Sequence, residues 1–147
     1  MTTETPILLV EDLTMAFGEF LVQKHVSFTV QSGQVFIIMG PSGCGKSTLL
    51  KHLTGLQPPA SGRVELLQSQ LWELESEARH LLLQRTGVLF QNGALWSGMT
   101  VAENIALPMH LHTDLSHEQI DDLTALKLAL VGLNDAGQQM PSELSGG

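Results

Sequence analysis

The run from residue 40 to residue 48 combines glycines with one lysine and hydroxyl side chains. It consists of Gly40, Pro41, Ser42, Gly43, Cys44, Gly45, Lys46, Ser47 and Thr48. This order fits the pattern G-x-x-x-x-G-K-[ST], in which glycines let successive backbone N–H groups converge on one anion. Lys46 can bring an ammonium to the β- and γ-phosphates of a nucleoside triphosphate, and the Ser47 hydroxyl can bind Mg²⁺. The run therefore predicts a loop that binds the phosphates of ATP or GTP.

The residues on either side of this run are those that such a loop needs. Val35–Met39 is an unbroken apolar stretch, which is typical of a strand buried on both faces. Leu49, Leu50 and Leu53 follow at helical spacing, and Gly55 is placed to end that helix. The helix, beginning near Lys46, would add the positive end of its dipole to the anion site. This context disfavours the alternative, a glycine-rich turn with an incidental lysine.

The first ninety residues read mainly as strands with two helices. Alternating or continuous apolar residues predict strands at 7–10, 26–30, 63–67 and 87–90. A second helix is expected over 72–85, with leucines on one side and an ion pair between Glu75 and Arg79 at i,i+4. The turn at 58–62 is indicated by its prolines and glycine.

The last third of the chain changes to a helical pattern. Thr100 with Glu103, and Ser116 with Gln119, each fit a capping box and should start a helix. Pro108 is expected to limit the first helix to about two regular turns. The second helix should end near Gly132. Its expected buried face consists of Ile120, Leu123, Leu126 and Leu130.

Composition narrows the class of protein. The 147 residues suit one domain, and 15 acidic against 7 basic residues give a net charge of −8, which argues against a general nucleic-acid-binding surface. The residues from Met1 to Pro6 show no secretory signal, and no apolar run approaches the ~20 residues that cross a bilayer. One cysteine excludes an internal disulfide. We expect an intracellular protein whose membrane role, if any, comes through a partner.

Three further features, in this order along the chain, resemble the ATP-binding cassette (ABC) ATPases. They are Phe17, Gln91 after an apolar stretch, and the final Leu-Ser-Gly-Gly, which consists of Leu144, Ser145, Gly146 and Gly147. The resemblance implies that Phe17 stacks on adenine and that Gln91 is a catalytic residue that contacts Mg²⁺ and the attacking water. It also implies that the final residues begin a signature that meets the γ-phosphate. Taken singly, each has a simpler reading: a core phenylalanine, a polar strand end, or a helix cap.

The resemblance also carries a fold. It implies an α/β, P-loop NTPase core with an N-terminal antiparallel β subdomain at 1–35, the core at 36–91, and a Q-loop and helical subdomain at 92–147. Members of this family continue with a second acidic strand and a catalytic glutamate, so the printed chain corresponds to a partial nucleotide-binding domain without the C-terminal half. We expect it to bind nucleotide without appreciable turnover by itself. The apolar stretch Val35–Met39 would then lack a neighbouring strand and favour aggregation.

A narrower resemblance links 89–96 and 100–108 to the Mla-type ATPases, although Trp96 stands where phenylalanine is more usual. It implies ATP and Mg²⁺ as cofactors and phospholipid traffic in the Gram-negative envelope. The implied partners are a membrane-spanning permease, a second copy bound head to tail, and a Mce-type periplasmic lipid-binding protein. The chain would lie in the cytoplasm, peripheral to the inner membrane, with no nucleic acid bound.

Alternative functions stay open at this point. Amino-acid and other small-solute importers share much of the same sequence, and a catalytically inactive nucleotide-binding module fits as well. Leu95, Trp96 and Met99 suit the docking of a permease helix, but core packing fits each of them equally. Cys44 is favoured as a passive small residue of the loop, and a reactive thiol is the alternative.

Overall fold

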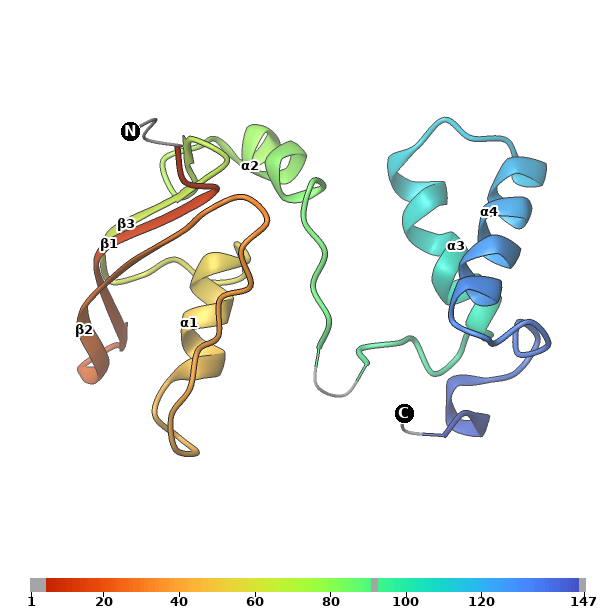
Figure 1. Ribbon diagram of the computed structural model, residues 1–147, viewed down its shortest axis with the longest axis horizontal. Coiled ribbons are helices and arrows are strands. Elements are labelled where there is room, and N and C mark those ends of the chain that lie inside the picture. The colour runs from red at the N-terminus through yellow and green to blue at the C-terminus, as the bar shows by residue number, and fades with distance from the viewer. Residues whose placement is uncertain (1–4, 91–92, 146–147) are drawn as a thin grey trace. The chain divides into compact units, whose positions relative to one another are not determined.

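The computed structural model describes residues 5–90 and 93–145 (Figure 1). The chain divides into two compact units, Met1–Val88 and Leu89–Gly147, which are described in turn. The first unit is an antiparallel sheet with two helices, and the second is helical. This division falls within the segment 87–90 that sequence reasoning assigned to a strand.

The first unit is built on a four-stranded antiparallel sheet with the order β2-β1-β3-β4. The strands are β1 Leu8–Phe17, β2 Phe20–Val30, β3 Ser61–Leu66 and β4 Ser69–Gln70. Val10, Leu13, Met15 and Val64 are fully buried in its core. The strands predicted at 7–10, 26–30 and 63–67 are confirmed, and β1 extends further than the pattern indicated. Burial of one face of the sheet fixes its register.

Two helices complete the core of this unit. Helix α1 runs from Lys46 to Leu53, as predicted, with Leu49 and Leu53 buried and Gly55 at φ 75° after its end. Helix α2 runs from Ser76 to Leu83 and is shorter than the expected helix 72–85. Its buried residue is Leu82.

The predicted ion pair in α2 is wrong. Glu75 precedes the helix as its N-cap residue, and its carbonyl accepts the Arg79 N–H at 2.9 Å. The Arg79 guanidinium lies over the ring of Trp72, 5.2 Å from the ring centre. This cation–π contact takes the place of the pair because the chain around Trp72 turns before the helix begins.

The two apolar segments expected as strands, 35–39 and 87–90, are irregular, so these two predictions are wrong. Val35 is 85% exposed, Met39 84% and Leu89 94%. A strand of this apolar kind needs hydrogen-bonded neighbours on its edges and covering layers on its faces. Within residues 5–90 and 93–145, β1 to β4 form a single sheet, and neither segment pairs with it.

The second unit contains α3, Val101–His112, α4, His117–Leu130, and a short 3₁₀ helix η1, Pro141–Glu143 (Figure 1). Both predicted capping boxes are present. The Glu103 carboxylate accepts the Thr100 N–H at 2.7 Å and the Thr100 hydroxyl at 3.0 Å. These bonds, the backbone one first, lower the pKa of Glu103 from its ordinary 4.5.

Two expectations for these helices are corrected. Helix α3 continues through Pro108 to His112, because proline removes one N–H without ending a helix that packs on a neighbour. The buried face of α4 is Ile120, Thr124 and Leu128, whereas Leu126 is 54% and Leu130 76% exposed. Apolar residues occur on both sides of α4, so packing rather than periodicity selects the face. The predicted end near Gly132, which has φ 75°, is confirmed.

Candidate functional site

The loop 40–48 joins the irregular segment 35–39 to the start of α1. Gly43 has φ 80° and Gly45 φ 97°, a left-handed region that favours glycine. Gly45 is the N-cap of α1, and a Cβ there would lie 2.7 Å from Cγ1 of Val22 on β2. Space and backbone conformation both require glycine at position 45, so β2 and α1 together fix the end of the loop.

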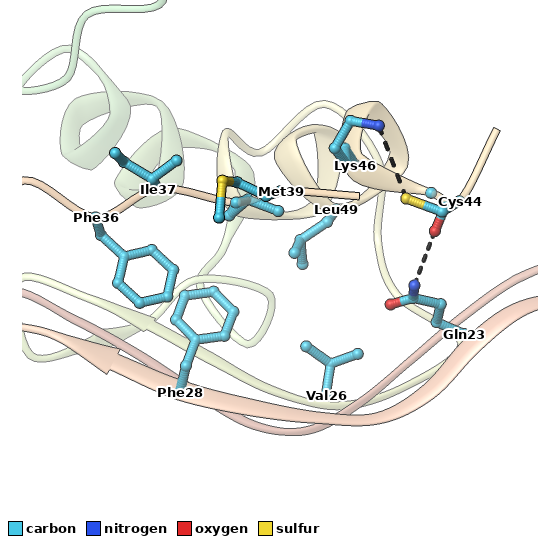
Figure 2. A pocket seen from close by; sticks show the side chains of 11 residues that line it. Gln23, Val26, Phe28, Phe36, Ile37, Met39, Cys44, Lys46 and Leu49 are labelled. Carbon is cyan, nitrogen blue, oxygen red and sulfur yellow. Dashed lines mark hydrogen bonds between the residues drawn. The ribbon is translucent and has the colours of Figure 1, made fainter. Parts of the chain in front are cut away.

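The Lys46 ammonium lies against the loop's own main chain. Its Nζ donates to the Gly40 carbonyl at 2.8 Å and to the Pro41 carbonyl at 2.7 Å. The Cys44 Sγ is 3.7 Å from the same nitrogen, a contact drawn in Figure 2. A Cβ on Gly40 would lie 2.6 Å from that sulfur, so the loop closes tightly at this point. The positive charge is thereby held among the residues of the predicted phosphate loop.

The start of α1 fits an anionic ligand. Within the described residues no side chain caps its N-terminus, and its first turn contains no acidic residue. The first N–H groups of a helix have no partner inside the helix, and the helix dipole favours negative charge there. Ser47 and Thr48 belong to this first turn, next to Lys46. The donor set of N–H groups, ammonium and hydroxyls suits a polyphosphate and its Mg²⁺.

Strand β2 contacts the loop through the Gln23 side chain. The Gln23 side chain donates from Nε2 to the Cys44 carbonyl at 2.8 Å (Figure 2). Beside this contact lies a cavity of about 270 Å³ between β2, the segment 36–39 and α1. Phe28 and Phe36 stack in its wall with ring centres 4.8 Å apart. The mostly apolar lining makes this space part of the packing under the loop rather than a place for phosphates.

Phe17 is at the end of β1, paired with Phe20 across the hairpin. Its side chain is 47% exposed, so it is not a core residue. Met15, two residues earlier on β1, pairs with Gln23, the β2 residue that holds the loop. The aromatic ring and the loop are thus supported by the same end of the hairpin. The stacking of Phe17 on adenine stays a prediction.

The remaining predicted residues fall outside the loop. Gln91, Gly146 and Gly147 lie outside the described residues. Ser145 is exposed and follows η1 in the second unit. Sequence reasoning missed Gln23, which lies on a strand with ordinary alternation and offers no motif. It also missed Asn104, whose side-chain amide makes hydrogen bonds with the main chain of Trp96, Met99 and Thr100, just before α3.

Residues 23–147 match the protein family described as ABC transporter, so this chain belongs to the ABC transporter family. It is 39% identical over 142 residues to the spermidine/putrescine import ATP-binding protein PotA of Pseudomonas aeruginosa, covering 97% of this chain and 38% of PotA. It is 36% identical over 141 residues to the intermembrane phospholipid transport system ATP-binding protein MlaF of Haemophilus influenzae, covering 96% of this chain and 53% of MlaF. The chain therefore spans about two fifths to one half of these relatives.

A solved structure shows the same fold. The dimeric, post-hydrolysis state of the ATP-binding cassette MJ0796 bound to ADP and Pi superposes with a TM-score of 0.84 at 26% identity, over 95% of this chain and 63% of that chain. The expected ABC ATPase fold, with an antiparallel sheet and helices, is confirmed, and this chain covers only part of the solved domain. The resemblance stated from the motifs is confirmed as well.

Proposed function

We propose that this chain is the ATP-binding part of a subunit that energises an ABC transporter. The observation that carries the proposal is the loop 40–48, where Lys46 and the uncapped start of α1 bring positive charge and free N–H groups together. Membership of the ABC transporter family supports it. The proposed role in transport is that of the whole subunit, to which this chain contributes the nucleotide loop and the helical unit.

The residues take separate roles in this proposal. The loop from Gly40 to Thr48 binds the phosphates, with Lys46 at the β- and γ-phosphates. Ser47 and Gln91 bind Mg²⁺, which neutralises phosphate charge when bound. Gln91 orients the attacking water, and Phe17 stacks on adenine. ATP hydrolysis then requires the catalytic carboxylate of the complete family domain.

A second copy of the protein completes the site in our proposal. The solved relative is described as a dimer bound to ADP and Pi. We place Ser145, Gly146 and Gly147 against the γ-phosphate held by the partner copy's loop, in a head-to-tail dimer. None of the helices in the described residues is long and apolar enough to cross a bilayer. A membrane-spanning permease would provide the translocation path, with this subunit on the cytoplasmic face of the inner membrane.

Phospholipid is the cargo that we propose, together with a Mce-type periplasmic partner. The likeness to MlaF, a phospholipid transport protein by name, supports this choice, as does the resemblance of residues 89–96 and 100–108 to the Mla-type ATPases. A small polar solute is the second candidate, because PotA, named for spermidine and putrescine import, is 39% identical to this chain. In this proposal the membrane-spanning and periplasmic partners determine the cargo, so the nucleotide loop does not distinguish the two candidates.

Equilibrium binding of ATP to the full-length protein tests the function. We expect ATP to bind in the presence of Mg²⁺ and AMP to compete poorly, because the loop recognises a polyphosphate. Ser47→Ala should remove most of the gain that Mg²⁺ brings while leaving some affinity for metal-free ATP. Equal affinities for ATP and AMP would contradict the proposal.

The cargo is tested with the permease complex in liposomes. Under the lipid proposal, ATP consumption rises with vesicle phospholipid alone and is insensitive to added spermidine or methionine. Stimulation by one of these solutes, and not by phospholipid, would establish the second candidate instead.

A further inference from the structure

The Gln23 side chain holds one particular peptide group of the loop. Its Nε2 donates to the Cys44 carbonyl at 2.8 Å, and Figure 2 shows the amide reaching from β2 to that oxygen. The peptide bond from Cys44 to Gly45 is trans, as are the others in the described part of the chain. In a trans peptide the C=O and the N–H point in opposite directions. Because its carbonyl is turned toward Gln23 on β2, this peptide directs the Gly45 N–H away from that strand.

The Gly45 N–H, so directed, is a donor that the protein itself does not use. It makes no hydrogen bond among residues 5–90 and 93–145. The next two N–H groups, of Lys46 and Ser47, belong to the first turn of α1, where N–H groups have no partner inside the helix. Successive main-chain N–H groups of this kind make an anion-binding concavity. The orientation of one peptide therefore decides whether Gly45 contributes a donor to it.

The loop alone would allow this peptide to turn over. Rotation of a peptide group changes ψ of the residue before it and φ of the residue after it, and glycine accepts either sign of φ. Gly45, at φ 97°, is that following residue. A reversed peptide would present the Cys44 carbonyl oxygen to the phosphates in place of the Gly45 N–H, and the two would repel each other. The hydrogen bond from Gln23 opposes this reversal, because it holds the carbonyl on the side of β2.

We propose that Gln23 is a positioning residue for polyphosphate binding, which acts through the Cys44 carbonyl to keep the Gly45 N–H facing the phosphates. This inference rests on the proposed function and adds to it a residue outside the loop. Gln23 itself touches the loop's main chain and the wall of the apolar cavity, together with Val26 and Leu49. Loss of its amide should therefore weaken the binding of phosphates without removing apolar packing.

Replacement of the amide by an apolar side chain of similar length tests the role in the full-length protein. Gln23→Met removes the donor, and its flexible thioether suits the apolar wall of the cavity. We expect the Kd for MgATP to rise about 3- to 10-fold, the worth of one ordinary hydrogen bond, while the midpoint of chemical denaturation stays that of the wild type. Gln138→Met is the matched control, since Gln138 is exposed and its side chain makes no hydrogen bond within the described residues.

Gln23→Glu separates the hydrogen bond from the effect of charge. An ionised carboxylate has no proton to donate and repels both the Cys44 carbonyl and ATP, so at neutral pH this variant should bind MgATP more weakly than Gln23→Met. As pH falls through the pKa of that carboxyl, its O–H can donate to the Cys44 carbonyl. Gln23→Glu should then bind MgATP more tightly than Gln23→Met at the same pH. Removal of the charge alone would bring the two variants only to equal affinities.

The inference is overturned if Gln23→Met binds MgATP as tightly as Gln138→Met, or if Gln23→Glu does not bind it more tightly than Gln23→Met in acid. If Gln23→Met also lowers the denaturation midpoint, the comparison in acid decides, because both variants lack the same amide and differ only in the regained O–H. Each of these failures leaves the proposed function standing as long as the wild type binds ATP. Failure of the wild type to bind ATP would instead refute the proposed function, and the role of Gln23 with it.

Discussion

At the scale of single residues, the chemistry of the loop follows from residue types that the sequence states directly. The glycines at 43 and 45 have the positive φ that their place in the pattern predicts, and Lys46 is held within the loop. The sequence pattern cannot reveal which distant side chains support the loop. Gln23 binds the Cys44 carbonyl across a separation of 21 residues, and only the fold brings them together. Asn104 was overlooked for a related reason, since an asparagine within a helix carries no signal of its main-chain partners.

Gly62 provides a test at this scale. It has φ 95°, and a Cβ there would lie 2.5 Å from the Asp12 carbonyl oxygen and 2.5 Å from Leu13 Cα, both main-chain atoms of β1. Gly62→Ala should therefore lower the free energy of unfolding by about 2–4 kcal/mol. Gly87→Ala is the control, because a Cβ at Gly87 meets nothing within 4 Å. Chemical denaturation of the two variants checks the difference, and equal stabilities would show that β1 and β3 are not packed as described.

At the scale of elements, capping boxes predicted the starts of α3 and α4 well, whereas strands were predicted only in part. The capping boxes at Thr100 and Ser116 formed because each depends on residues three apart. The strand 26–30 formed because alternation matched a sheet with one buried face. The apolar segments 35–39 and 87–90 carry the residues of buried strands, but a strand also needs neighbours, which the described residues do not supply. The buried face of α4 was misjudged because leucines occur on both of its sides.

Removing the cap of α3 tests the local origin of that helix. Thr100→Ala deletes the hydroxyl that accepts the Glu103 N–H at 3.2 Å. We expect a loss of about 1 kcal/mol in the free energy of unfolding. Ser97→Ala, in the exposed turn before the helix, should leave stability within experimental error. A loss with Ser97→Ala as large as that with Thr100→Ala would contradict the account.

The same cap predicts a dependence on pH. The folded pKa of Glu103 is below its ordinary 4.5, so its stabilising contribution is present above that value and is lost as pH falls through the folded pKa. The melting temperature of the wild type should therefore fall more steeply with decreasing pH than that of Glu103→Gln. Parallel pH profiles for the two proteins would exclude this role for Glu103.

At the scale of the whole molecule, the exposed apolar segments have a measurable consequence. Ile37 is 71% exposed, and Val35, Met39 and Leu89 are exposed to an even greater extent. Exposed apolar surface of this kind promotes association. We expect the 147-residue chain expressed alone to self-associate. Light scattering at increasing protein concentration measures this. A monodisperse monomer with a cooperative melt would contradict the prediction.

The central claim is that the loop 40–48 binds the phosphates of ATP, and a matched pair of lysine variants tests it most directly. Lys46 lies in the loop, whereas Lys51, in the last turn of α1, is exposed. We would measure the Kd of full-length protein for MgATP by calorimetry in Lys46→Ala and Lys51→Ala. The account predicts that Lys46→Ala weakens binding by about 10- to 100-fold, the loss of a charge-assisted contact, while Lys51→Ala retains the wild-type Kd. Equal Kd values for the two variants would show that the phosphates bind elsewhere.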